Sequence, residues 1–83
     1  MVTLLYFAGL RESLGCSREL VPLPVAATVS ALVEHLRSRD APWTDAFGPG
    51  KQWRVAVNQQ MANLATPLKA GDEVAFFPPV TGG

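Results

Sequence analysis

The stretch that decides the fold is residues 73–83, EVAFFPPVTGG, at the end of the chain. Its first half, residues 73–77, is apolar and aromatic, which predicts a buried strand. Two prolines follow, and because proline lacks a backbone N–H, they end the strand and favour an extended, polyproline-like path. The closing glycines have no Cβ, so the tip is the thinnest peptide available. Residues 78–83 are therefore predicted to form a stiff, slender tail that ends in the carboxylate of Gly83.

A tail of this shape suits insertion into the narrow active site of a partner protein. The alternative is a frayed terminus, since chain ends are commonly disordered. The two prolines and the aromatic strand before them favour the functional interpretation, because a stiff spacer carries the tip away from the globule.

The composition indicates one small globular domain. With 83 residues, of which 48% are hydrophobic and 17% charged, the chain has enough material for a single core. Seven basic residues balance seven acidic ones, so nothing points to nucleic acid or to an anionic membrane. The apolar run at residues 2–10 is too short to span a bilayer and has no basic residues before it, so we expect no signal peptide. The single cysteine forms no internal disulfide, which is consistent with a cytoplasmic location.

The side chains are poorly equipped for catalysis. The chain has one histidine and no metal-ligand spacing, Gly-rich phosphate loop or Ser/His/Asp set. Cys16 is either a sulfur-carrying nucleophile or a small space-filling residue, and the second interpretation is favoured because no neighbouring His or Lys lowers its pKa. We therefore expect no metal and no tightly bound cofactor, and any chemistry falls to partner proteins.

The remaining patterns predict a small mixed α+β fold. Thr28 is a good N-cap, and an apolar stripe at i, i+3, i+4 and i+7 follows it. Trp43 and Phe47 share a face of a short helical turn and are expected to close one end of the core. The expected elements are, in chain order, a strand at 2–7, a helical turn at 8–14, a strand at 19–23, a helix from 28 to about 39, a strand at 53–57, a short strand at 60–62 and a strand at 73–77.

A hairpin, a crossing helix and apolar first and last strands indicate a β-grasp domain. We expect residues 1–77 to form a mixed sheet of four to five strands, with one main helix packed on one face. The first and last strands should lie side by side at its centre. Phe77 then faces away from the helix beside Phe7, as a patch that binds a partner. The expected core residues are Val2, Leu4, Leu32, Val33, Leu36, Val55, Val57, Val74 and Phe76.

The chain resembles a known family along its whole length. The stretches that carry the resemblance are residues 5–8 with 11–12, then 56–59, and above all 71–83. They are similar to the small, sulfur-carrying subunits of molybdopterin synthase, which are ubiquitin-like β-grasp proteins. A Gly-Gly end is shared by many ubiquitin-like proteins, whereas the longer Phe-Phe-Pro-Pro-Val-x-Gly-Gly ending is much more specific.

The resemblance implies a function in molybdenum cofactor biosynthesis. A ubiquitin-activating-type enzyme would use ATP to adenylate the Gly83 carboxylate, and a sulfur donor would convert it to a thiocarboxylate. The tail would then enter the large synthase subunit, in a heterotetramer of two small and two large subunits, and give its sulfur to cyclic pyranopterin monophosphate. Gly83 is thus the reactive residue. The tail residues implied are Pro78, Pro79, Val80, Thr81 and Gly82, and the partner interface implied is Phe7, Arg11, Met61 and Phe77.

Three alternatives remain open. One is the sulfur carrier of thiamine biosynthesis, which shares the fold and the Gly-Gly end; the two prolines and the flanking aromatic residues favour the molybdopterin subunit. The second is a ubiquitin-like protein modifier, whose terminus would be joined to lysines of target proteins. The third is a structural binding module with an inert tail.

Overall fold

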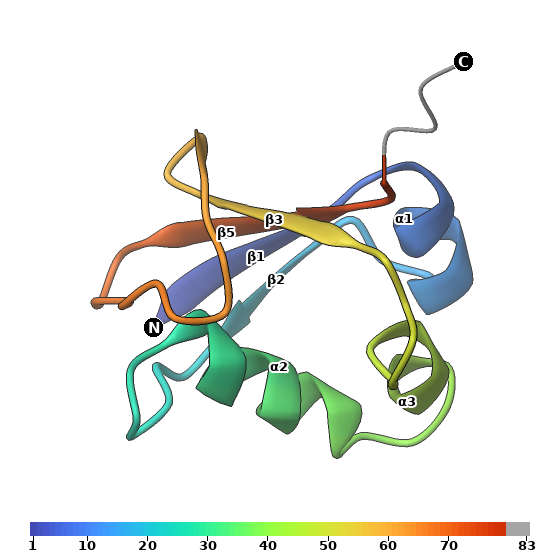
Figure 1. Cartoon of the computed structure of the whole chain (residues 1–83), viewed down its shortest axis with the longest axis horizontal. Helices are drawn as coiled ribbons and strands as arrows, with labels where there is room; N and C mark the ends of the chain where they lie inside the picture. Colours follow the sequence, from blue (N-terminus) through green and yellow to red (C-terminus); the bar gives the residue numbers. More distant parts are fainter. Residues whose placement is uncertain (80–83) are drawn as a thin grey trace.

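The computed structural model describes residues 1–79, in which a five-stranded sheet lies over a layer of helices (Figure 1). The predicted residues 80–83 of the tail lie outside the described part of the chain. The strands are β1 (Val2–Tyr6), β2 (Arg18–Val21), β3 (Arg54–Val57), β4 (Gln60–Met61) and β5 (Glu73–Phe77), and the helices are α1 (Ala8–Leu14), α2 (Val29–Arg37) and α3 (Trp43–Ala46).

The strand order β2-β1-β5-β3-β4 confirms the β-grasp prediction. The first and last strands, β1 and β5, are parallel neighbours at the centre of the sheet, and the other pairs are antiparallel. The register pairs Leu5 with Ala75 and Tyr6 with Phe76, which places the C-terminal ends of both central strands at the same edge.

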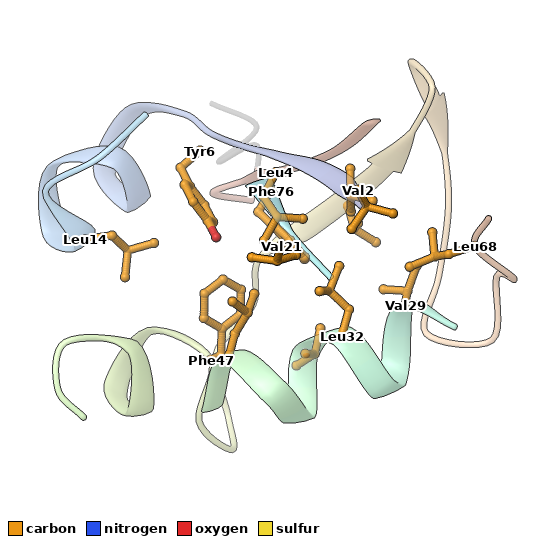
Figure 2. Close-up of a cluster of buried hydrophobic side chains, with 14 residues drawn as sticks. Val2, Leu4, Tyr6, Leu14, Val21, Val29, Leu32, Phe47, Leu68 and Phe76 are labelled. Atoms are coloured by element: carbon orange, nitrogen blue, oxygen red, sulfur yellow. The ribbon is translucent and has the colours of Figure 1, made fainter. Parts of the chain in front are cut away.

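The core lies between the sheet and α2. Figure 2 shows side chains from the strands, among them Leu4 and Phe76, pointing toward Leu32 of α2 and Phe47. Every predicted core residue is buried except Val57, which packs against the core but stays partly exposed at the end of β3, beside the turn into β4. Phe47 is fully buried and its ring meets that of Phe76 edge-on at 5.1 Å, as expected for a residue that closes the core.

Local chemistry sets the ends of the elements. Thr28 caps α2, with its hydroxyl accepting a hydrogen bond from the Ala31 N–H at 3.2 Å. Gly15 ends α1 in the left-handed conformation, with φ of 75°, which glycine adopts at little cost. Asn58 and Gln59 have φ of 50° and 69°, as a two-residue turn that matches the twist of a hairpin requires.

Several predicted boundaries are wrong by one or two residues. Strand β3 begins at Arg54 rather than Trp53, and β4 ends at Met61 rather than Ala62. The second strand begins at Arg18 and ends at Val21, because Pro22 cannot donate a ladder hydrogen bond. The main helix ends at Arg37 rather than near residue 39. Strand β1 stops one residue early, because Phe7 is the N-cap of α1.

No helix of residues 1–79 is long and apolar enough to cross a membrane. Within the same residues, no group of three His, Cys, Asp or Glu side chains could hold a metal ion.

Candidate functional site

The sheet surface turned away from α2, here called the outer face, is largely apolar. The strand register defines it, because paired residues on neighbouring strands point to the same side. One row of side chains crosses all five strands. The other residues of this face lie on either side of that row, toward the two ends of the strands. The row is Arg18, Leu5, Ala75, Ala56 and Met61, and the other members of the outer face are Leu20, Thr3, Glu73, Phe77 and Arg54.

Two phenylalanines stand where β5 passes into the tail. The Phe7 N–H donates a hydrogen bond of 3.1 Å to the Phe76 carbonyl, which holds the residue after β1 against the end of β5. The Phe7 side chain is 46% exposed, and Phe77 is partly buried on the outer face. Pro78 is partly buried and Pro79 exposed, directly after β5. The two phenylalanines predicted from strand alternation therefore lie at the base of the tail, and their binding role stays a prediction.

The other two predicted interface residues are exposed. Arg11 lies in α1, and its N–H donates to the Phe7 carbonyl at 3.3 Å, so the two residues lie one helical turn apart at the same end of the sheet. Met61 is 61% exposed on β4, opposite Ala56. The structure thus brings Phe7, Arg11 and Phe77 to one end of the sheet. Met61 belongs to the outer face but lies on the edge strand.

A groove of about 580 Å³ runs beside the base of the tail. Its apolar lining comes from α1, α3 and the tail, and its charged groups are Asp45 and Lys51. The lining residues are Gly9, Leu10, Ser13, Pro42, Asp45, Ala46, Lys51, Gln52, Trp53, Pro78 and Pro79.

A network of hydrogen bonds and one ion pair lies on the helix side of the sheet, and the sequence analysis did not predict it. The Tyr6 hydroxyl donates to Glu19 Oε2 at 2.9 Å, and Arg39 donates to both Glu19 oxygens at 3.0 and 2.9 Å. The Arg39 guanidinium lies 4.5 Å from the centre of the Trp43 ring, a cation–π distance. These four residues, here called the clamp, tie β1, β2, the end of α2 and α3 together.

The clamp changes the acidity of its own groups. Burial opposes ionisation of Glu19, but hydrogen bonds from Arg39 and Tyr6 outweigh it and lower the pKa of the carboxyl. Burial, followed by the hydrogen bond to Glu19, raises the pKa of the Tyr6 phenol. The ion pair is fixed in its charged form, so its role is to hold the elements together rather than to exchange protons.

Cys16 has the environment of a packing residue. It is partly buried and packs against the core cluster. Burial, with a smaller contribution from the Glu19 charge, raises the pKa of its thiol, which keeps the sulfur protonated and unreactive. This agrees with the space-filling interpretation.

A second polar network closes the opposite end of the sheet. Asn58 donates to Asp72 Oδ1 at 3.0 Å and accepts from the Glu73 N–H at 3.0 Å, while the Lys69 N–H donates to Asp72 Oδ2 at 2.9 Å. The hydrogen bond from Asn58 lowers the pKa of Asp72. The sequence analysis predicted no contact between Asn58 and Asp72, because no local pattern links residues 14 apart.

The strand order, with parallel first and last strands at the centre of the sheet, defines a ubiquitin-like β-grasp protein. Residues 4–83 match the ThiS family, to which the chain belongs. It is 43% identical to the molybdopterin synthase sulfur carrier subunit of Escherichia coli, with 100% of both chains covered. The corresponding subunit of Mycobacterium tuberculosis is 39% identical, with 99% of this chain and 96% of that protein covered.

Solved structures agree on the fold. The small archaeal modifier protein 1 of Haloferax volcanii is 30% identical, with a TM-score of 0.76 over 95% of this chain and 97% of that one. A chain in the complex of subunits 1 and 2 of the molybdopterin-converting factor from Helicobacter pylori is 26% identical. Its TM-score is 0.67, over 99% of this chain and 97% of that one.

Proposed function

We propose that this chain is the sulfur carrier subunit of a molybdopterin synthase. The observation that carries the proposal is the full-length similarity to sulfur carrier subunits of that enzyme, which includes the tail residues. The arrangement of residues 1–79 supports it, because the exposed Phe7 and the partly buried Phe77 stand where the tail begins.

The chemistry follows from the weakness of a carboxylate as an acyl electrophile. A ubiquitin-activating-type enzyme joins the Gly83 carboxylate to AMP with ATP, releasing pyrophosphate. A sulfur donor then attacks the carbonyl carbon and AMP leaves, which yields a thiocarboxylate. Its sulfur attacks cyclic pyranopterin monophosphate within the large subunit, and water then cleaves the acyl C–S bond, which leaves the sulfur on the pterin and restores the Gly83 carboxylate. Two carriers supply the two sulfurs. In this scheme the chain supplies the covalent sulfur at Gly83 and its partners supply ATP binding, acids and bases.

The partners proposed are the large synthase subunit and the activating enzyme. The Helicobacter pylori complex of subunits 1 and 2 supports a large-subunit partner for this fold. In our proposal the outer face docks on the large subunit, in a heterotetramer of two small and two large subunits, and the tail residues Val80 to Gly83 reach its active site. The same surface, with Phe7, Arg11, Met61 and Phe77, serves the activating enzyme in turn.

Intact-mass spectrometry of the chain after incubation with activating enzyme, ATP and a sulfur donor tests the proposal. We expect one oxygen to be replaced by sulfur at Gly83, and the sulfur to be lost again when large subunit and pterin precursor are added. Sulfur found on Cys16 instead, or no exchange at all, would contradict the proposal.

A second candidate function is protein modification, and the similarity to the archaeal modifier protein favours it. In that case the C-terminus forms isopeptide bonds with lysines. A blot of cell extract with an antibody to this chain separates the two: a ladder of conjugates supports modification, whereas free chain alone supports the sulfur carrier.

A further inference from the structure

The centre of the outer face is formed by its shortest side chains. Ala75 on β5 and Ala56 on β3 are paired, and the large residues Leu5 and Met61 continue the same row on either side. Phe77 lies two residues beyond Ala75 on β5. Ala56 is buried and Ala75 is partly exposed, so their methyl groups lie low between the larger neighbours. A short side chain lets an approaching group come closer to the sheet backbone than leucine or methionine would.

Two arginines flank the alanine pair in different directions, Arg18 across the strands and Arg54 along β3 toward the tail. Arg18 is beside Leu5 on β2, and Arg54 is beside Phe77 on β3. Their strands are three spacings apart in the sheet, which amounts to about 14 Å. Both residues are exposed. The ion pairs among residues 1–79 are Arg37 with Glu34 and Arg39 with Glu19, so neither outer-face arginine has a carboxylate partner within the described residues.

The charges of the outer face are separated along the strands. Its acidic residue, Glu73, starts β5, whereas Arg54 pairs with Phe77 at the end of β5. The outer face is therefore positive toward the tail and negative at the far end, although the whole chain has no formal net charge. A partner of matching polarity would be oriented by this field before contact.

We propose that the outer face recognises a protein surface that seats one bulky apolar side chain over Ala56 and Ala75 and presents a carboxylate to each of Arg18 and Arg54. Protein interfaces are enriched in arginine and aromatic residues and place apolar anchors at the centre. Arginine can also bind a carboxylate through two parallel hydrogen bonds, which fixes orientation as well as strength.

Two such pairs, placed in different directions from an anchor, fix the rotation of the partner about that anchor. The tail leaves β5 beside Arg54. A fixed rotation of the two proteins therefore directs the tail to a single site on the partner. The inference rests on the proposed function, because it takes the large subunit of molybdopterin synthase as the partner.

The experiment measures binding of the full chain to the purified large subunit at low and high salt. Arg18→Glu and Arg54→Glu should each slow association about tenfold at low salt, with the difference shrinking at high salt. Lys69→Glu makes the same charge change in the loop at the opposite end of the sheet and serves as the matched control, with association expected to stay unchanged. Thermal melts of every variant check folding.

A second variant tests the alanine pair. Ala75→Leu fills the space above the sheet without altering charge, and it should weaken binding about tenfold while the thermal midpoint stays unchanged. If replacing an acidic residue of the large subunit by arginine restores the binding of Arg54→Glu, that residue is the carboxylate partner of Arg54.

The outcomes separate the two proposals. If the unaltered chain binds the large subunit and both arginine variants bind equally well, the inference is wrong while the proposed function stands. If the unaltered chain does not bind the large subunit, both are wrong. Sedimentation that shows the chain pairing with itself through the outer face, blocked by Ala75→Leu, would also overturn the inference.

Discussion

On β5, Phe76 and Phe77 are consecutive residues with opposite surroundings. Phe76 is fully buried, and the centre of its ring lies 5.1 Å from the ring centre of Phe47 and 5.4 Å from that of Trp53. Phe77 lies on the outer face at the base of the tail and remains partly exposed. The inner face of the sheet has a helix to cover it and therefore stabilises the fold. The outer face has similar apolar residues without a helix, so they are available to a partner.

The largest expected effect is on sulfur transfer, and it comes from a change in the tail that leaves both faces of the sheet intact. Deleting Gly82 and Gly83 should abolish sulfur acceptance completely, because the new terminus is too short to reach the activating site. The chain should still fold and still bind the large subunit, because the core and the outer face lie within residues 1–79. Sulfur incorporation followed by mass spectrometry, with thermal melts and binding in parallel, measures all three. Incorporation into the shortened chain would remove Gly83 as the carrier.

The next effect tests the inner face. Phe76→Ala should destabilise the fold by about 3–5 kcal/mol, the usual range for a buried phenylalanine that leaves a cavity. Denaturant unfolding measures the change. A loss below about 1 kcal/mol would show that Phe76 is not at the centre of the core.

Phe77→Ala is the matched change on the outer face. It should weaken binding to the large subunit by about 2 kcal/mol, as expected for an aromatic anchor in an interface. Its thermal midpoint should change little compared with that of Phe76→Ala. If Phe77→Ala unfolds instead, the two faces have been assigned the wrong way round.

The smallest effect concerns the clamp and depends on pH. The folded-state pKa of Glu19 is lowered, so the carboxylate contributes stability above its unfolded pKa and loses it as pH falls through the folded value. Between about pH 5 and pH 3, the unaltered chain should therefore lose more stability than Glu19→Gln. Asp72, whose pKa is also lowered, is present in both proteins and cancels in the comparison. Equal pH profiles would show that the clamp does not stabilise the fold through its charge.

The sequence predicted the strands and the main helix well, because their signals are local and periodic. Alternation placed Leu4 and Phe76 inward, and the stripe after Thr28 placed Leu32 in the core. It erred at the end of β2, which was predicted to continue past Pro22, and at Val57, which stays partly exposed beside the turn into β4.

The candidate site was predicted in part. Phe7 and Phe77 follow from alternation at the ends of two strands, and the tail follows from proline and glycine chemistry alone. Arg18 and Arg54 were missed, because an arginine in a strand has no meaning until the register shows which residues lie beside it.

The amino-acid sequence alone was enough to place the elements and the inward and outward sides of each strand, because these depend on residues a few positions apart. The chemistry of the tail stays a prediction. Only the tertiary structure joined Tyr6 to Glu19 and Arg39, Asn58 to Asp72, and Ala56 to Ala75. These contacts join residues far apart in the chain, and their partners are chosen by strand order and register, which no local pattern encodes.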